Sequence, residues 1–246
     1  HLFSDAKFPT RELKRTKSRI ISALKSSVSN HSALANMAFR YEALKGSGYE
    51  TPAGGTIDTI SKINSKRLSK RLEYFNKNAL KRIYVKGPND INQMESIIKN
   101  DCDWKKVANV REIPEVKKIR ESNEVIFVPV PNANQAQVLI GRIMTASEVR
   151  SNELDYQSFA ANFLGSGFTS KLFQSLRVQK GLTYSVSAYV SDQYSYGRSG
   201  IMTFTKNETL IDLLNATKST IESVVESVNA NELQLAKKSI KGKYLI

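Results

Sequence analysis

The amino-acid sequence predicts an α+β fold, in which a mixed or antiparallel sheet is covered by helices on one face. Apolar residues recur at helical spacing near both ends of the chain, which is typical of amphipathic helices. Segments rich in β-branched and aromatic residues gather in the second half, at 124–130, 135–144, 183–190 and 199–205, and indicate strands. Because helical stretches lie between these strands, a sheet with a helical layer accounts for their order.

The first hundred residues are predicted to be mostly helical. Gly46 and Gly48 end the second helix, and Thr56 and Ser65 are expected to cap the next two. One strand stands among them, at 79–86, and ends at a Gly-Pro-Asn-Asp turn. The predicted helices cover residues 9–29, 32–44, 56–63, 65–74 and 91–99.

A linker is predicted at residues 103–118, where periodicity is lost and charged residues are frequent. It separates a first domain, at 1–102, from a second domain at 119–246. In the second domain the last two strands are expected to form a hairpin across residues 192–197. The helices predicted there cover 154–164, 169–179 and 210–228, followed by a last helix capped by Asn231.

Composition limits the classes of function. The 246 residues, 40% of them hydrophobic, suffice for a packed core, and no apolar run approaches the roughly 20 residues that span a bilayer. A net charge of +14 favours an acidic partner, such as nucleic acid, an anionic membrane surface or an acidic peptide. Basic residues are spread along the chain among acidic ones, so we expect a solvated surface rather than a nucleic-acid-binding stripe.

Few residues are suited to hydrolytic chemistry. The only histidines, His1 and His31, stand far apart, so a histidine-based metal site is not expected. The single Cys102 excludes an internal disulfide and a multi-cysteine zinc site. No Gly-x-Ser-x-Gly motif is present. Hydrolysis by this chain alone is therefore not predicted.

The pair Arg177 and Tyr184 is the best candidate for a binding role. Arg177 falls in the last turn of a predicted helix and Tyr184 just inside the next strand, so we expect both at one edge of the sheet. A guanidinium and a phenol placed there can donate hydrogen bonds to a peptide carbonyl or to the oxyanion that forms on it. The ordinary alternative is that Arg177 complements its helix C-terminus and Tyr184 packs in the core.

Residues 164–186 resemble the signature of the C-terminal part of insulinase/pitrilysin-type zinc peptidases, the inverzincins that include mitochondrial processing peptidase. That signature reads Leu-Gly-Gly-x-x-Ser-Arg-Leu-Phe and then Leu-Arg-Glu-x-x-Gly-Leu-Ala-Tyr. Residues 49–68, 128–141 and 231–237 resemble further segments of the family. The residues that match the signature in register are Gly165, Ser170, Leu172, Phe173, Leu176, Arg177, Gly181, Leu182 and Tyr184.

The resemblance implies mitochondrial-processing-peptidase-like repeats and a zinc site outside this chain. Residues 1–102 correspond to the latter half of one repeat, and 119–246 to a second repeat that is C-terminally incomplete. In the family the metal lies in another repeat, on an inverted His-x-x-Glu-His helix with a distant Glu as third ligand. This chain lacks the motif, and Ala23 stands where the Glu is expected. The resemblance therefore implies no metal bound here and zinc in a partner subunit or other half.

The resemblance implies that Arg177 and Tyr184 hold a peptide substrate and stabilise the tetrahedral intermediate, facing the zinc across a closed chamber. The leading hypothesis is a non-catalytic, substrate-binding subunit or half of a zinc metalloendopeptidase, inactive without its zinc-bearing partner. One alternative is a degenerate structural or assembly subunit, and another is a basic protein that binds nucleic acid or an anionic surface. Abundant Lys, Asn and Ser with one Cys favour a bacterial periplasmic or cell-envelope protein.

Overall fold

The computed structural model describes residues 6–79, 84, 86, 90–101, 116 and 123–244. The chain forms two compact units. The first unit combines His1–Ser26 with Pro52–Ile113, and the second combines Ser27–Thr51 with Pro114–Ile246. Apart from single residues, the strand predicted at 79–86 and the linker predicted at 103–118 lie outside the described residues. The predicted division into repeats at 102 and 119 stays a prediction.

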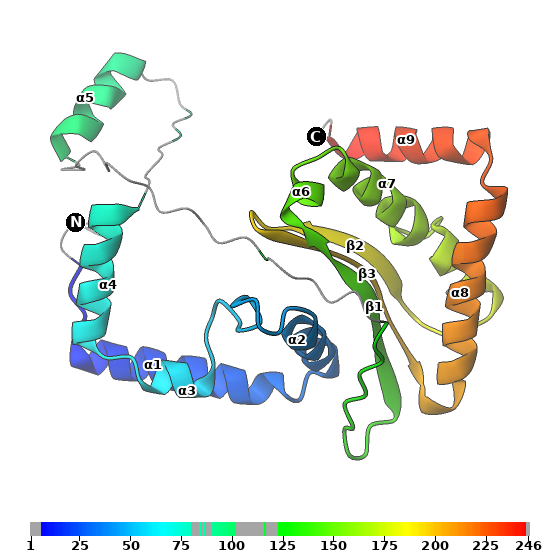
Figure 1. The fold of residues 1–246 in the computed structure, drawn as a ribbon, viewed down its shortest axis with the longest axis horizontal. Helices are drawn as coiled ribbons and strands as arrows, with labels where there is room; N and C mark the ends of the chain where they lie inside the picture. Colours follow the sequence, from blue (N-terminus) through cyan, green and yellow to red (C-terminus); the bar gives the residue numbers. More distant parts are fainter. Residues whose placement is uncertain are drawn as a thin grey trace. The chain divides into compact units, whose positions relative to one another are not determined.

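The described part of the first unit is mostly helical, as the sequence predicts for this region. Lys17 of the first helix donates hydrogen bonds of 2.7 Å to the carbonyls of Ser61 and Ile63. The cap predicted at Ser65 is wrong by one residue, because the Asn64 side chain accepts from the backbone N–H of Arg67. The helices are α1 (Thr10–Ser27), α3 (Ile57–Ser61), α4 (Ser65–Asn78) and α5 (Ile91–Asp101) (Figure 1).

The second unit is built on a three-stranded antiparallel sheet in the order β1–β3–β2. Its strands are β1 (Gln135–Thr145), β2 (Val186–Asp192) and β3 (Tyr196–Lys206). β2 and β3 form the predicted hairpin, in which Val186 faces Thr203. β1 pairs with the other edge of β3, from Gln135 opposite Lys206 to Thr145 opposite Tyr196. The α+β class with an antiparallel sheet is therefore confirmed.

One face of the sheet carries the main helical layer and the main core of the second unit. The helices on this side are α7 (Glu153–Gly165), the π-helix η1 (Phe173–Gln179) and α8 (Leu210–Ser227) (Figure 1). Apolar side chains from η1, from α8 and from this face of the sheet form a closed cluster. Its buried members are Leu172, Leu176, Val186, Ile201, Leu213 and Ala216.

Helix α2 (His31–Ala43) packs on β1 from the opposite face. The Asn36 amide donates to the sulfur of Met202, and the ring of Phe39 lies against Gly141. A second apolar cluster forms here around Ile143 and Tyr196. The sequence assigns residues 31–43 to the first repeat but does not indicate this contact with the sheet.

The strand predicted at 124–130 is absent, and this prediction is wrong. The segment is described but pairs with none of the described strands, and Val125 and Phe127 are 99% and 80% exposed. Apolar composition indicates a strand only where a neighbour accepts its hydrogen bonds. The last helix, α9 (Ala230–Tyr244), is capped by Asn229 rather than Asn231.

None of the described helices is long and apolar enough to cross a bilayer. The remaining short elements are α6 (Ala146–Val149) and the 3-10 helix η2 (Asn207–Thr209). α6 begins with a capping box, in which Thr145 and Glu148 each bond the other's backbone N–H. The Glu148 carboxylate also pairs with Arg142 at 2.8 Å, which ties α6 to β1.

Candidate functional site

Arg177 lies on a π-helix and not on the regular helix that the sequence predicts. The π-type hydrogen bonding, between residues five apart, persists at the C-terminal end of η1, where the Lys180 N–H donates to the Ser175 carbonyl. Gly181 then adopts a φ of 62°, and the Leu182 N–H reaches back to the Leu176 carbonyl at 2.8 Å. This left-handed stop needs a glycine and directs the chain into β2. Single π-turns occur frequently at functional sites.

The structure brings Arg177 and Tyr184 together. The guanidinium carbon of Arg177 lies 4.3 Å from the ring centroid of Tyr184 and 4.9 Å from that of Phe173, so the cation is held between two aromatic rings. Tyr184 is 71% exposed, and its interpretation as a core residue is wrong. The Arg177 guanidinium forms no hydrogen bond or ion pair with any described residue, which leaves its N–H donors free for a ligand.

Sequence reasoning missed the aromatic neighbours of the pair. Phe168 is 74% exposed and meets Phe173 edge to face, with ring centroids 5.1 Å apart. Phe173 stands four residues before Arg177, a spacing that places two side chains on one side of a helix. That spacing is the signal from which Phe173 was predictable. Phe168 and Tyr184 form an exposed apolar border beside the guanidinium.

A buried threonine network fixes the segment that leads to Tyr184. Thr205 donates to the Leu182 carbonyl at 2.6 Å. Thr203 and Thr183 both donate to the Ser185 carbonyl, at 3.0 and 2.9 Å. These threonines lie on the core side of the sheet and are almost fully buried. Because the backbone on both sides of Tyr184 is bonded to β3, the phenol is held beside Arg177 rather than on a free loop.

Gly165 is required for close packing of α7 on β2, next to the site. A Cβ at this position would lie 2.1 Å from the backbone nitrogen of Ala188, which no side chain tolerates. Gly167 has a φ of 86° but meets no neighbouring atom, so its role is the turn itself. Gly165 and Gly167 therefore act by different physical means.

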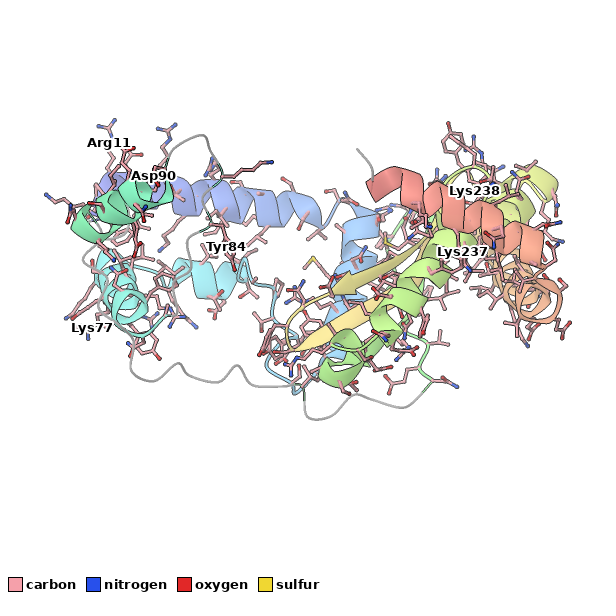
Figure 2. The ribbon with its side chains drawn as sticks, turned by 90° about the horizontal axis from the view of Figure 1, so that it is seen from above. Arg11, Lys77, Tyr84, Asp90, Lys237 and Lys238 are labelled. Carbon is pink, nitrogen blue, oxygen red and sulfur yellow. The ribbon has the colours of Figure 1, made fainter. Side chains whose placement is uncertain are left out.

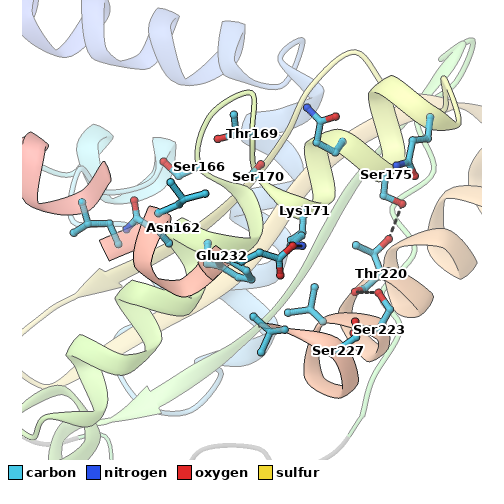
Figure 3. A pocket seen from close by; sticks show the side chains of 18 residues that line it. Asn162, Ser166, Thr169, Ser170, Lys171, Ser175, Thr220, Ser223, Ser227 and Glu232 are labelled. Carbon is cyan, nitrogen blue, oxygen red and sulfur yellow. Dashed lines mark hydrogen bonds and ion pairs between the residues drawn. The ribbon is translucent and has the colours of Figure 1, made fainter. Parts of the chain in front are cut away.

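A separate cavity of about 700 Å³ lies between α7, η1, α8 and α9, and Arg177 and Tyr184 do not line it (Figure 3). Lys171 forms an ion pair with Glu232 of α9 inside it, and the hydrogen bond from Lys171 lowers the pKa of Glu232. Lys171 therefore pairs inside this cavity, which Arg177 does not line. Many hydroxyls of the cavity already have partners, such as Thr220, which donates to Ser175 at 2.8 Å.

No group of three or more His, Cys, Asp or Glu side chains suited to a metal is found in the part of the chain that the structure describes. Ala23 lies on α1 and offers no ligand atom. The residues present therefore give zinc no ligand set among the described positions. The prediction that zinc lies in a partner subunit or other half stays a prediction.

The model of the family described as "Peptidase M16 inactive domain" matches residues 73–240. The chain belongs to this family. The resemblance to insulinase/pitrilysin-type peptidases is thereby confirmed for the non-catalytic half, and the M16 match covers both Arg177 and Tyr184.

One sequence relative and two solved structures are consistent with this M16 assignment. The chain is 24% identical to "Non-peptidase homolog YmxG" of Helicobacter pylori, over 98% of this chain and 55% of that protein. An M16 inactive domain from Pseudomonas fluorescens shares the fold with a TM-score of 0.79 at 18% identity, over 98% of this chain and 58% of that one. A protease from Helicobacter pylori gives 0.78 at 13% identity, over 97% and 59%. The chain thus spans little more than half the length of each of these three proteins.

Proposed function

We propose that this chain is the non-catalytic, substrate-binding part of a zinc metalloendopeptidase, and that Arg177 and Tyr184 contact the peptide. The observation that carries the proposal is a guanidinium without polar partners among the described residues, held beside an exposed phenol. The M16 inactive-domain match adds support, since the pair lies inside it.

Both side chains are donors suited to a peptide carbonyl. Arg177 presents its planar set of N–H groups, and Tyr184 its O–H. Donors aimed at the carbonyl oxygen bind the oxyanion of a tetrahedral intermediate more strongly than the neutral carbonyl, which accelerates cleavage. Zinc in a partner subunit or other half would supply the activated water.

The surroundings of the pair reduce the cost of forming these bonds. Phe173 and Tyr184 hold the guanidinium from two sides, and the threonine network holds the backbone around Tyr184. Donors that are already in place lose little conformational freedom when the substrate binds. A site of this kind acts best on rigid elements, and here β3 and η1 provide them.

The test is peptide cleavage by the complete protein mixed with a zinc peptidase that carries the inverted His-x-x-Glu-His motif. We expect Arg177→Ala to lower kcat by about 100-fold, as loss of one oxyanion donor does, with a smaller loss for Tyr184→Phe. Arg150 and Tyr194 form a matched control, because Arg150 lies 4.4 Å from the exposed Tyr194 ring in the same way. Tyr194→Phe should leave cleavage unchanged.

A structural or assembly subunit is the second candidate. The name of the YmxG relative, a non-peptidase homologue, favours it. The same variants separate the two functions. If the complex assembles and cleaves equally well with Arg177→Ala, Tyr184→Phe and Tyr194→Phe, the assembly role holds and the binding role is wrong.

The bacterial periplasm or cell envelope remains our proposed compartment, on composition alone. It is tested by fractionating cells that express the complete protein. Recovery with envelope markers supports it, and recovery with cytosolic enzymes contradicts it.

A further inference from the structure

The first unit carries a strong excess of positive charge. Helix α1 has six basic residues and one acidic residue, and α4 has five and one. Within the described ranges, only Lys77 of these basic residues forms an ion pair, with Glu73 at 2.7 Å, and both side chains are largely exposed. Exposed ion pairs of this kind contribute little to stability, so most of the positive charge is available to a partner.

On α4 the charge is arranged as a stripe rather than spread evenly. Lys66, Lys70, Tyr74 and Lys77 follow one another at intervals of four, four and three residues, which places them on one side of the helix. All four are exposed, and Figure 2 labels Lys77 among them. The apolar Leu68 and Leu72 stand on the other side and are half-buried. The stripe, defined as these four residues, is about 16 Å long.

Aromatic groups lie within the stripe and beside it. Tyr74 is 44% exposed, and so to a similar degree is Phe75. The guanidinium carbon of Arg71 lies 5.3 Å from the Tyr74 ring and covers one of its faces. A nucleic-acid base needs an open aromatic face for stacking, whereas a phenol at a lipid headgroup needs only its rim and hydroxyl. With one Tyr74 face taken by Arg71, a base could stack only on the other face, so the ring suits a lipid headgroup better than a base.

A lysine-lined cavity of about 650 Å³ adjoins the N-terminal end of the stripe. Lys14, Lys17 and Lys66 line it, and no Asp or Glu does. Lys17 uses two of its donors on the carbonyls of Ser61 and Ile63, while Lys14 and Lys66 form no ion pair with described residues. A concave surface with lysines and without carboxylates suits the phosphate of a lipid headgroup.

We propose that the stripe, with the adjoining lysine cavity, docks the protein on an anionic phospholipid bilayer. Each Lys or Arg near such a surface strengthens partitioning by about fivefold, so three lysines together amount to about a hundredfold. The attraction weakens with salt, because screening acts over about 10 Å at moderate ionic strength. The docking is peripheral and independent of the proposed peptide site.

Vesicle co-sedimentation of the complete protein tests the proposal, with phosphatidylcholine vesicles that contain or lack phosphatidylglycerol. We expect binding only to the anionic vesicles, decreasing as salt is raised. The triple variant Lys66→Gln, Lys70→Gln, Lys77→Gln should lower the partition coefficient about a hundredfold. All three side chains are exposed, so the fold should persist, which circular dichroism verifies.

The matched control removes the same charge elsewhere. Lys237, Lys238 and Lys241 lie exposed on α9, and Figure 2 labels the first two. Their triple Gln variant should bind within about threefold of the unaltered protein, since only close charges act strongly. Equal losses in both variants would show that net charge and not the stripe is responsible, and would overturn the proposal. Equal binding to neutral vesicles, or tighter binding to single-stranded DNA than to anionic vesicles, would also overturn it.

Discussion

The helices of the two compact units differ in how many apolar side chains they bury. In the second unit a sheet separates two apolar clusters, and six buried side chains close the main one. In the first unit, Ile60 is the one buried hydrophobic residue among the described positions, and α1 and α4 bury none of their side chains. The strand layer of the second unit gives its helices an apolar surface to cover, and no such layer is among the described residues of the first unit.

The contrast extends to charge and to function. The second unit holds the backbone on both sides of Tyr184 by hydrogen bonds from β3, with Arg177 beside it on η1, and the first unit presents an exposed basic surface. A precise hydrogen-bonding site needs rigid support, while attraction to an anionic surface needs only accessible charge. Pairs of substitutions, one in each unit, test whether the second unit is the more tightly packed of the two.

The largest difference is expected for glycine replacement. Gly165→Ala places a Cβ 2.1 Å from the Ala188 backbone nitrogen and should lower the free energy of unfolding by about 3 kcal/mol or more. Gly54→Ala in the first unit meets no atom and should be neutral or slightly stabilising. Urea denaturation of both variants measures this. Equal effects would contradict the close approach of α7 and β2.

Loss of a buried hydroxyl is expected to have the next largest effect. Thr203→Val removes the donor to the Ser185 carbonyl and to the Thr183 hydroxyl and should cost about 1.5 kcal/mol. Thr203→Ser keeps the donor and should recover most of that loss. Thermal unfolding followed by circular dichroism compares them. A Val variant as stable as the original would mean that the network does not support the segment around Tyr184.

A smaller, pH-dependent effect is expected at Glu148. The hydrogen bond from Arg142 lowers the pKa of this carboxyl, with backbone and side-chain bonds from Thr145 acting the same way against partial burial. A lowered pKa in the folded state stabilises the fold above the unfolded pKa, near 4.5, and this contribution is lost as the pH falls through the folded value. Glu148→Gln should therefore cost about 0.5–1 kcal/mol at pH 7.

The stability difference between Glu148→Gln and the original should shrink below pH 4.5 and vanish once the carboxyl is protonated. Glu73→Gln is the control in the first unit. The Glu73 carboxyl also has a lowered pKa, through its hydrogen bond from Lys77, but the pair is exposed and should contribute nothing measurable. Denaturation from pH 3 to pH 7, about the range over which carboxyls titrate, distinguishes the two. A pH-independent Glu148 effect would rule out the ionised pair as its cause.

The smallest effect is expected at Tyr189, and in the opposite direction. Its hydroxyl is buried without a hydrogen-bond partner among the described residues, and burial raises its pKa although Arg198 opposes the shift. Tyr189→Phe removes an unsatisfied polar group and should change stability by no more than about 0.5 kcal/mol, toward greater stability. Chemical denaturation measures this, and a clear loss would reveal a partner for the hydroxyl.

Local sequence patterns were sufficient for most of the fold. Apolar spacing located α1, α4 and α8 within a few residues, and the β2–β3 hairpin followed from two β-branched runs around a turn. The secondary structure of such elements follows from the pattern of residues within the element itself. The absent strand at 124–130 and the packing of α2 on the sheet depend on partners distant in sequence, which periodicity does not identify.

The candidate site was predictable in part for the same reason. Arg177 and Tyr184 are seven residues apart across one helix end, so local geometry was enough to place them together. The threonine network depends on contacts with β3, and neither this network nor the π-helix was indicated. The stripe on α4 was missed because charge was examined along the chain, although the spacing of Lys66, Lys70 and Lys77 already places them on one side of a helix.

The most direct test of the central claim is cleavage of a peptide by the complete protein reconstituted with its zinc-bearing partner. With Arg177→Ala, the account predicts a kcat lower by about 100-fold, while complex formation and the zinc content of the partner stay unchanged. The Tyr194→Phe control should cleave normally. Undiminished cleavage by the Arg177→Ala complex would contradict the assignment of the Arg177 and Tyr184 pair to the substrate.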